Sequence, residues 1–154
     1  MRLLIQRVSR AEVEVDGTVV GSVGRGLCVL AGFGPEDDAG LPGSKLWDKA
    51  LEKLLDLRIF PDAEGKLNVG LREFGGGVLV VSQFTLYADL KKGRRPSFHL
   101  AAAPHLAEAL YDELVRDLSR RLPGRVSSGL FGAEMDVSLV NWGPVTIMLD
   151  TAGL

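Results

Sequence analysis

The chain is poor in the residues that build most catalytic centres. Its 154 residues include two histidines, His99 and His105, and one cysteine, Cys28. No Cys–His or His–His ligand spacing is present, so we expect neither a protein-built metal site nor a cofactor. A lone cysteine in an apolar run predicts a buried thiol in the reducing cytoplasm. The absence of a Gly-x-Ser-x-Gly elbow, a dinucleotide fingerprint and a Walker motif argues against the enzyme classes that carry them.

Long apolar runs and a strong excess of one charge are also missing. No hydrophobic stretch approaches the roughly 20 residues that span a bilayer, so we expect no membrane association. The net charge of −2 does not indicate a nucleic-acid-binding protein. One segment departs from this balance, because Lys91, Lys92, Arg94 and Arg95 place four positive charges within five residues. Such a run is usually a solvated loop, but beside a site it can bind phosphates.

Strand patterns dominate the chain and are interrupted by two helical ones. Asp16-Gly17 predicts a hairpin, and leucines at helical spacing predict helices over residues 46–55 and from Pro104 to Pro123. The expected strands cover residues 2–8, 11–15, 18–20, 27–31, 58–60, 78–82, 135–140 and 145–149. No βαβ alternation is apparent. The pattern therefore predicts one α+β domain over residues 1–154, with a largely antiparallel sheet and two main helices packed on it.

Two stretches place polar or backbone-special residues directly against apolar strands. One is Ser82-Gln83-Phe84-Thr85-Leu86, which closes the run 78–81. The other is Asn141-Trp142-Gly143-Pro144-Val145-Thr146, whose first four residues separate the last two expected strands. We interpret them as two halves of one active site. The residues alone leave a simpler interpretation open, in which the hydroxyl groups end a strand by bonding the backbone and Gly-Pro forms a turn.

These stretches resemble the two signature motifs of the D-aminoacyl-tRNA deacylase family. Ser82–Leu86 matches the first motif, and Asn141-x-Gly143-Pro144-Val145-Thr146 matches the second. Other stretches agree in order along the chain: Ile5–Val8, Gly24–Leu27, Leu57–Phe60, Lys92–Phe98, and Phe131–Ala133 with Met135. The resemblance implies a barrel-like core and hydrolysis of the ester that joins a D-amino acid to tRNA. It also implies release of glycine mischarged on tRNA(Ala).

The resemblance further implies a homodimer with each active site at the subunit interface. One subunit would supply Ser82–Leu86, and the other would insert Gly143-Pro144 with a cis peptide bond. Asn141 belongs to this second motif, and Arg7 matches the family residue that holds the dipeptide. Rigid backbone carbonyls suit a filter that must accept many side chains, because they obstruct an L side chain at the α-carbon. Glycine has no side chain to obstruct and would pass.

The resemblance leaves two roles open for Thr85. As a nucleophile its hydroxyl would need a general base, and none is evident. In the interpretation that we prefer, Thr85 acts with Gln83 or Phe84 as an oxyanion hole. The ribose 2′-OH of the terminal adenosine would then activate the attacking water.

The same interpretation gives roles to other residues. Ser82 would position the terminal adenosine, and Phe131 and Met135 would line its pocket, although both fit equally well as core residues. The basic run Lys91–Arg95 would bind acceptor-stem phosphates, which predicts salt-sensitive binding of tRNA.

Two other functions fit parts of the sequence. A related editing deacylase that removes L-alanine from tRNA would carry a different first motif, so the intact Ser82–Leu86 argues against it. A non-catalytic nucleic-acid-binding module on the same fold would be expected to be more basic than this chain.

Overall fold

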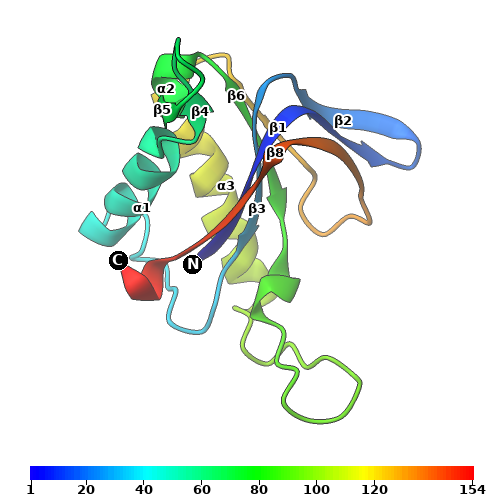
Figure 1. Ribbon diagram of the computed structural model, residues 1–154. Helices are drawn as coiled ribbons and strands as arrows, with labels where there is room; N and C mark the ends of the chain where they lie inside the picture. The colour runs from blue at the N-terminus through cyan, green and yellow to red at the C-terminus, as the bar shows by residue number, and fades with distance from the viewer.

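A curved six-stranded sheet carries the fold in the computed structural model, which describes residues 1–154 (Figure 1). Its strand order is β2-β1-β3-β6-β7, and β8 pairs with β1. The strands of this sheet are β1 (Arg2–Val15), β2 (Thr18–Val23), β3 (Gly26–Gly32), β6 (Gly77–Ser82), β7 (Val126–Ser128) and β8 (Asp136–Asp150). A separate two-stranded sheet joins β4 (Phe60–Pro61) to β5 (Leu67–Val69). The helices are α1 (Lys45–Asp56), α2 (Leu71–Phe74) and α3 (Pro104–Arg121), with 3₁₀ turns η1 (Phe84–Tyr87) and η2 (Thr151–Gly153).

β1 organises the sheet because it pairs antiparallel with three other strands. Its first half pairs with β3 and its second half with β2, while β8 runs beside both halves. The hairpin to β2 turns at Asp16 and Gly17, whose φ angles of 49° and 73° are those that an Asp-Gly turn favours. β2 curls back towards β7, where a Cβ on Gly21 would lie 2.4 Å from the carbonyl oxygen of Ser128. The sheet is therefore nearly closed, like a barrel.

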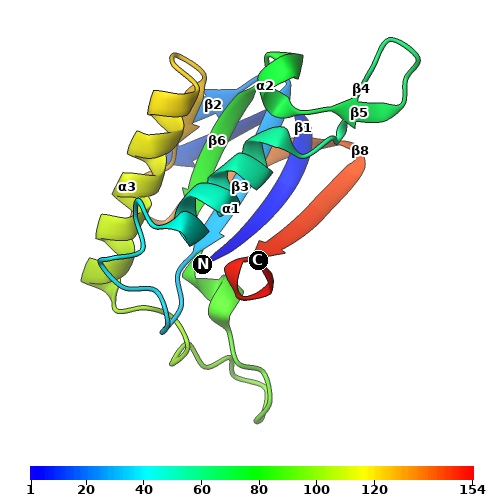
Figure 2. The same ribbon diagram turned by 90° about the vertical axis from the view of Figure 1, so that its left-hand side faces the viewer.

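α1 and α3 cover one face of this sheet (Figure 2). The main core lies between them and includes the fully buried Trp47, Leu51 and Leu114. The opposite face carries a second, smaller cluster: Val8, Ala11, Val13, Cys28, Leu79 and Val81. This split follows from the alternation of side chains along each strand. No helix is both long and apolar enough to cross a membrane.

The α+β class and the largely antiparallel, barrel-like sheet are confirmed, but part of the topology was not predicted. β6 runs parallel to both β3 and β7. The crossovers pass through α1 and α3, so strands and helices do alternate here. The expectation of no such alternation was wrong. The strands at 27–31 and 78–82 and the helix between them were expected, but their parallel pairing is tertiary and leaves no local pattern. β7, with three residues, gives no period-two signal.

Element boundaries differ for similar reasons. The stretches expected as strands 2–8 and 11–15 form the single strand β1, and those expected as 135–140 and 145–149 form the single strand β8. The strand expected at 58–60 is shifted to β4, and the short elements β5 and α2 were missed. Runs of two to four residues contain too little periodicity to predict an element.

Candidate active site

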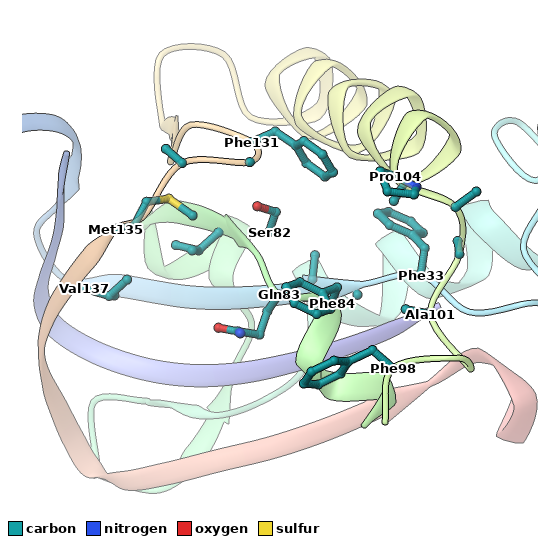
Figure 3. A pocket seen from close by; sticks show the side chains of 18 residues that line it. Phe33, Ser82, Gln83, Phe84, Phe98, Ala101, Pro104, Phe131, Met135 and Val137 are labelled. Atoms are coloured by element: carbon teal, nitrogen blue, oxygen red, sulfur yellow. The ribbon is translucent and has the colours of Figure 1, made fainter. Parts of the chain in front are cut away.

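A cavity of about 640 Å³ opens at the end of β6. Ser82, Gln83 and Phe84 contribute to its lining, and so do Phe131 and Met135 from the segment that precedes β8. Figure 3 shows the ring of Phe131 and the thioether of Met135 on either side of the Ser82 hydroxyl. Thirteen of the 18 lining residues are hydrophobic, and none has a titratable side chain. The cavity can therefore hold a largely apolar group but supplies no acid or base of its own.

The first motif leaves the sheet gradually and is held against β3. The N–H of Gln83 donates to the carbonyl of Ala31 at 2.7 Å, which continues the parallel pairing beyond Ser82. Gly32 permits this approach, since a Cβ there would lie 2.7 Å from the Gln83 carbonyl oxygen. Phe84 and Thr85 then begin η1, so their N–H groups have no acceptor within that turn. Two adjacent N–H groups are thus free to bind an oxygen beside the cavity.

Thr85 does not line the cavity, and its side chain is exposed. Its hydroxyl accepts a hydrogen bond of 2.6 Å from the side-chain amide of Gln83. An amide can orient a hydroxyl but cannot take its proton. The geometry therefore supplies no general base for Thr85.

A Ser–His–Asp arrangement lies nearby but outside the cavity. The hydroxyl of Ser97 is 2.9 Å from Nδ1 of His99, and Nε2 of His99 is 3.9 Å from the carboxylate of Asp89. None of these three residues lines the cavity, and His99 is exposed. They hold together the loop that follows η1, and a role as a nucleophilic triad does not fit their position.

Phe131 and Met135 are at once cavity wall and edge of the core. The Phe131 ring packs 5.8 Å from the Tyr111 ring, whose hydroxyl donates to the Val80 carbonyl at 2.8 Å. Burial raises the pKa of Tyr111 to about 12, so this hydroxyl remains a donor. Met135 fits because Gly129 has no side chain: a Cβ there would lie 2.7 Å from the sulfur.

The basic run lies on a loop that begins and ends beside the cavity. Lys91, Lys92, Arg94 and Arg95 are exposed, and none forms a salt bridge. The loop projects away from the sheet at the bottom of Figure 1. Phe98 follows the run, lines the cavity and packs edge-on to Phe84 with ring centroids 4.9 Å apart. Sequence reasoning missed Phe98 as a lining residue, although its place beside the basic run was a usable signal.

The second motif forms an exposed loop within β8, not a hairpin between two strands. Pairing with β1 is interrupted between Asn141 and Thr146. The Asn141 side chain closes the loop, because its oxygen accepts from the Val145 N–H at 2.7 Å and its amide donates to the Val145 carbonyl at 3.2 Å. Gly143 and Pro144 lie exposed at its tip, and the peptide bond between them is cis.

Arg7 fastens this loop from the protein side. Its Nε donates to the Trp142 carbonyl at 2.7 Å, and its Nη1 donates to the Ile59 carbonyl. Its guanidinium carbon lies 4.5 Å from the centroid of the Trp142 ring. Burial lowers the pKa of Arg7, and no carboxylate forms a salt bridge with it. The charge is therefore met by carbonyl oxygens and by an aromatic face.

The two motifs do not meet within one chain. Ser82, Gln83, Phe84, Phe131 and Met135 share the cavity, whereas none of Arg7, Asn141, Gly143 and Pro144 lines it. No group of three or more His, Cys, Asp or Glu side chains could hold a metal ion.

Comparison with known proteins gives a consistent result. The family model of D-Tyr-tRNA(Tyr) deacylase matches residues 4–150. The D-aminoacyl-tRNA deacylase of Nitratidesulfovibrio vulgaris is 64% identical over the whole chain and 95% of its own length. That of Pseudomonas fluorescens is 54% identical over 98% of this chain and 100% of its own length.

Two solved structures share the fold. The c-Myc DNA Unwinding Element Binding Protein aligns with a TM-score of 0.87 and 39% identity, covering 97% of this chain and 98% of that one. A probable eukaryotic D-amino acid tRNA deacylase aligns with a TM-score of 0.77 and 24% identity, covering 96% and 97%.

Proposed function

The chain belongs to the D-Tyr-tRNA(Tyr) deacylase family, and on that premise we propose that it hydrolyses the ester bond of D-aminoacyl-tRNA. The products are the free D-amino acid and tRNA, and glycine on tRNA(Ala) is a further substrate. We place this activity in the cytoplasm, where aminoacyl-tRNA is used. The observation that carries the proposal is the apolar cavity bordered by Ser82, Gln83 and Phe84, with two free N–H groups beside it.

The cavity fits the terminal adenosine of tRNA. A purine is flat and largely apolar on its faces, so it can pack against the Phe131 ring and the Met135 thioether that line the cavity. The Ser82 hydroxyl, which lies between them, can bond a ring nitrogen or the ribose. This places the ester, attached to the ribose, near the N–H groups of Phe84 and Thr85.

The chemical step then needs no catalytic side chain. The oxygen of a water molecule attacks the ester carbonyl, whose developing negative charge is stabilised by the free N–H groups. The ribose 2′-OH relays the water's proton to the leaving 3′-oxygen as the acyl–oxygen bond breaks. Thr85 supports this reaction by orienting Gln83 and by its N–H, since its hydroxyl has no base.

A second subunit would complete the site. Within one chain the Gly143-Pro144 loop is exposed and outside the cavity, so a symmetric dimer can bring each loop to the partner's cavity. Exposed apolar side chains on β8, including Val137, Val140 and Met148, offer a surface for this contact. The Gly143 and Pro144 carbonyls would bond the substrate amine and obstruct an L side chain. Asn141 and Arg7 hold the loop that presents them.

The basic loop supplies the affinity for RNA. Its four unpaired cations, Lys91, Lys92, Arg94 and Arg95, lie beside the cavity that would hold the 3′ end, where acceptor-stem phosphates follow. A concentrated patch of this kind lets a chain of net charge −2 bind tRNA.

The test is hydrolysis of matched D- and L-aminoacyl-tRNA by the wild type and by Thr85→Ala, with a 2′-deoxy terminal adenosine as a third substrate. We expect cleavage of the D-ester alone, retained activity in Thr85→Ala, and loss of activity with the 2′-deoxy substrate. Loss in Thr85→Ala with retention on the 2′-deoxy substrate would make Thr85 the catalytic hydroxyl.

The same assay addresses the other functions and the shared site. Cleavage of L-alanyl-tRNA in preference to D-esters would identify the related editing activity. Binding of tRNA or DNA without any cleavage would identify a binding module, such as the name of the DNA-unwinding-element protein suggests for that relative. In a purified mixed dimer of one Ser82→Phe subunit and one Gly143→Ala subunit, the one open cavity would face the wild-type loop. The preference for the D-ester, lost in the Gly143→Ala homodimer, should therefore return, and a mixed dimer without this preference would contradict the shared site.

A further inference from the structure

We propose that Trp142 is a positioning residue for the Gly143-Pro144 loop and that Arg25 assists it. The indole ring ties the loop to a separate part of the chain. This inference rests on the proposed function, because it concerns the chiral filter of that same site. Trp142 occupies the variable position of the second motif, so the motif itself assigns it no role.

The Trp142 ring packs against an aromatic pair that belongs to neither motif. Phe60 in β4 and Phe74 at the end of α2 are stacked, with centroids 4.3 Å apart and planes at 15°. The Trp142 centroid lies 6.3 Å from Phe60 and 6.0 Å from Phe74, in tilted geometry with both. Phe60 is fully buried. The ring therefore rests on a surface fixed by the main core and not on the strand that carries it.

Two cations lie against the same ring. The guanidinium carbon of Arg7 is 4.5 Å from the Trp142 centroid, and that of Arg25 is 5.2 Å from it. Neither arginine forms a salt bridge. The π face meets the charge of Arg25, and it meets the charge of Arg7 together with the Trp142 and Ile59 carbonyls. Arg25 comes from the turn between β2 and β3. The ring thus connects the loop to the turn between β2 and β3.

Arg7 contacts both the backbone and the side chain of Trp142, and it also contacts Gly143. Its Nε bonds the Trp142 carbonyl at 2.7 Å while its guanidinium carbon lies 4.5 Å from the centroid of the Trp142 ring. A Cβ on Gly143 would lie 2.9 Å from Nη2 of Arg7, so the same guanidinium is in contact with the filter dipeptide. Without the ring, Arg7 would be held only by its bonds to the Trp142 and Ile59 carbonyls. Its guanidinium could then shift, and the Gly143 and Pro144 carbonyls with it. Because Trp142 does not line the cavity, the ester-binding groups should be affected much less.

The experiment compares Trp142→Leu, Trp142→Phe and Arg25→Gln for kcat and KM on D- and L-aminoacyl-tRNA. In Trp142→Leu we expect the ratio of D- to L-ester kcat/KM to fall by about tenfold, because a small displacement of a positioning group is amplified at the reacting centre. Trp142→Phe keeps an aromatic face and should recover most of the ratio, while Arg25→Gln should lower it by about threefold. In each variant kcat for the D-ester should change far less than the ratio does.

Leu118→Ala is the matched control. It removes a fully buried apolar side chain from α3, an element that carries neither motif, and should lower stability. Loss of the same ratio in this control would mean that Trp142 acts only through general stability and would overturn the inference. An unchanged ratio in Trp142→Leu would overturn it too. If Trp142→Leu does not fold, an unchanged ratio in both Trp142→Phe and Arg25→Gln overturns it. A wild type that cleaves neither ester refutes the proposed function instead.

Discussion

The two motif regions are built in opposite ways. The region around Ser82 is hollow: apolar side chains surround a cavity, and the polar groups beside it are largely unpaired N–H groups. The Gly143-Pro144 region encloses no such cavity, and its backbone is fastened by Asn141, Arg7 and the Trp142 ring. The Ser82 region has space to bind a substrate group, whereas the Gly143-Pro144 region presents its own backbone at the surface.

This contrast suggests a division of work. An apolar cavity beside free N–H groups suits binding and the chemical step, whereas a loop fastened at several points suits discrimination by obstruction. Changes in the cavity should therefore lower the rate for every ester. Changes in the loop should alter the preference between D- and L-esters.

The largest effect is expected from Gly32→Ala, which breaks the cavity side. The new Cβ would lie 2.7 Å from the Gln83 carbonyl oxygen and push the first motif away from β3. We expect kcat/KM for the D-ester to fall by about 100-fold or more, with the preference for the D-ester unchanged. Gly24→Ala is the control, since a Cβ there meets nothing within 4 Å. Activity close to wild type in Gly32→Ala would show that this contact does not position the motif.

A smaller effect is expected from Gly143→Ala, which breaks the loop side. Gly143 has a φ of +143°, and its Cβ would lie 2.9 Å from both Nη2 of Arg7 and the Val145 nitrogen. The ratio of D- to L-ester kcat/KM should fall by about tenfold or more, mainly through faster L-ester cleavage. Gly17→Ala shares an unfavourable φ of +73° but meets no neighbour, and should leave the ratio unchanged. A fall in the D-ester rate without a change in the D/L preference would contradict the proposal that the loop serves discrimination and the cavity serves the chemical step.

The pH dependence of the reaction tests whether the cavity supplies an acid or a base. Because no titratable side chain lines the cavity, kcat/KM for the D-ester should change monotonically between about pH 6 and 8.5. Uncatalysed hydrolysis of the same ester, measured in parallel, gives the reference slope. A bell-shaped profile would mean that an acid and a base reach the ester from elsewhere, such as a partner subunit.

The smallest functional effect is expected from Cys28, which lies in the second core cluster. Burial raises the pKa of its thiol to about 11, so the fold favours the protonated form. This contribution to stability is complete below the ordinary thiol pKa of about 8.5 to 9 and is lost as pH rises towards 11. Denaturant titrations at pH 8 and 10.5 should show a larger loss of unfolding free energy in the wild type than in Cys28→Ala. Equal losses of unfolding free energy in the two proteins would contradict this role of the Cys28 thiol. Below pH 9 the preference of the enzyme for the D-ester should be the same in both.

The sequence predicted the cavity better than it predicted the loop's supports. The Ser82–Leu86 motif, Phe131 and Met135 were all expected at one site. The structure brings Ser82, Gln83, Phe84, Phe131 and Met135 together at the cavity, but Thr85 does not line it. Part of the remaining lining consists of alanines and a proline near the start of α3. Such residues carry no chemical signature and become lining residues only through the fold.

The residues that support the loop were harder to predict because they reach it through tertiary contacts. Arg7 was expected through the family resemblance, but the contact between Arg25 and Trp142 joins distant segments and depends on how β4 and α2 fold. The parallel pairing of β6 with β3 was missed for the same reason, because strand pairing is tertiary. Its pairing with β7 was missed because a three-residue strand leaves no periodic pattern.

β1 has a consequence for how this chain can vary in length. This strand carries Arg7 and pairs on one side with β3, whose last residues contact Gln83. On its other side it pairs with β8, which carries the Gly143-Pro144 loop. One residue inserted into β1 would turn Arg7 to the opposite face and offset β3 from β8 in a single step. The exposed loop at 90–96 has no such constraint and can gain or lose residues without moving either motif. Length changes should therefore accumulate in that loop and be excluded from the first strand.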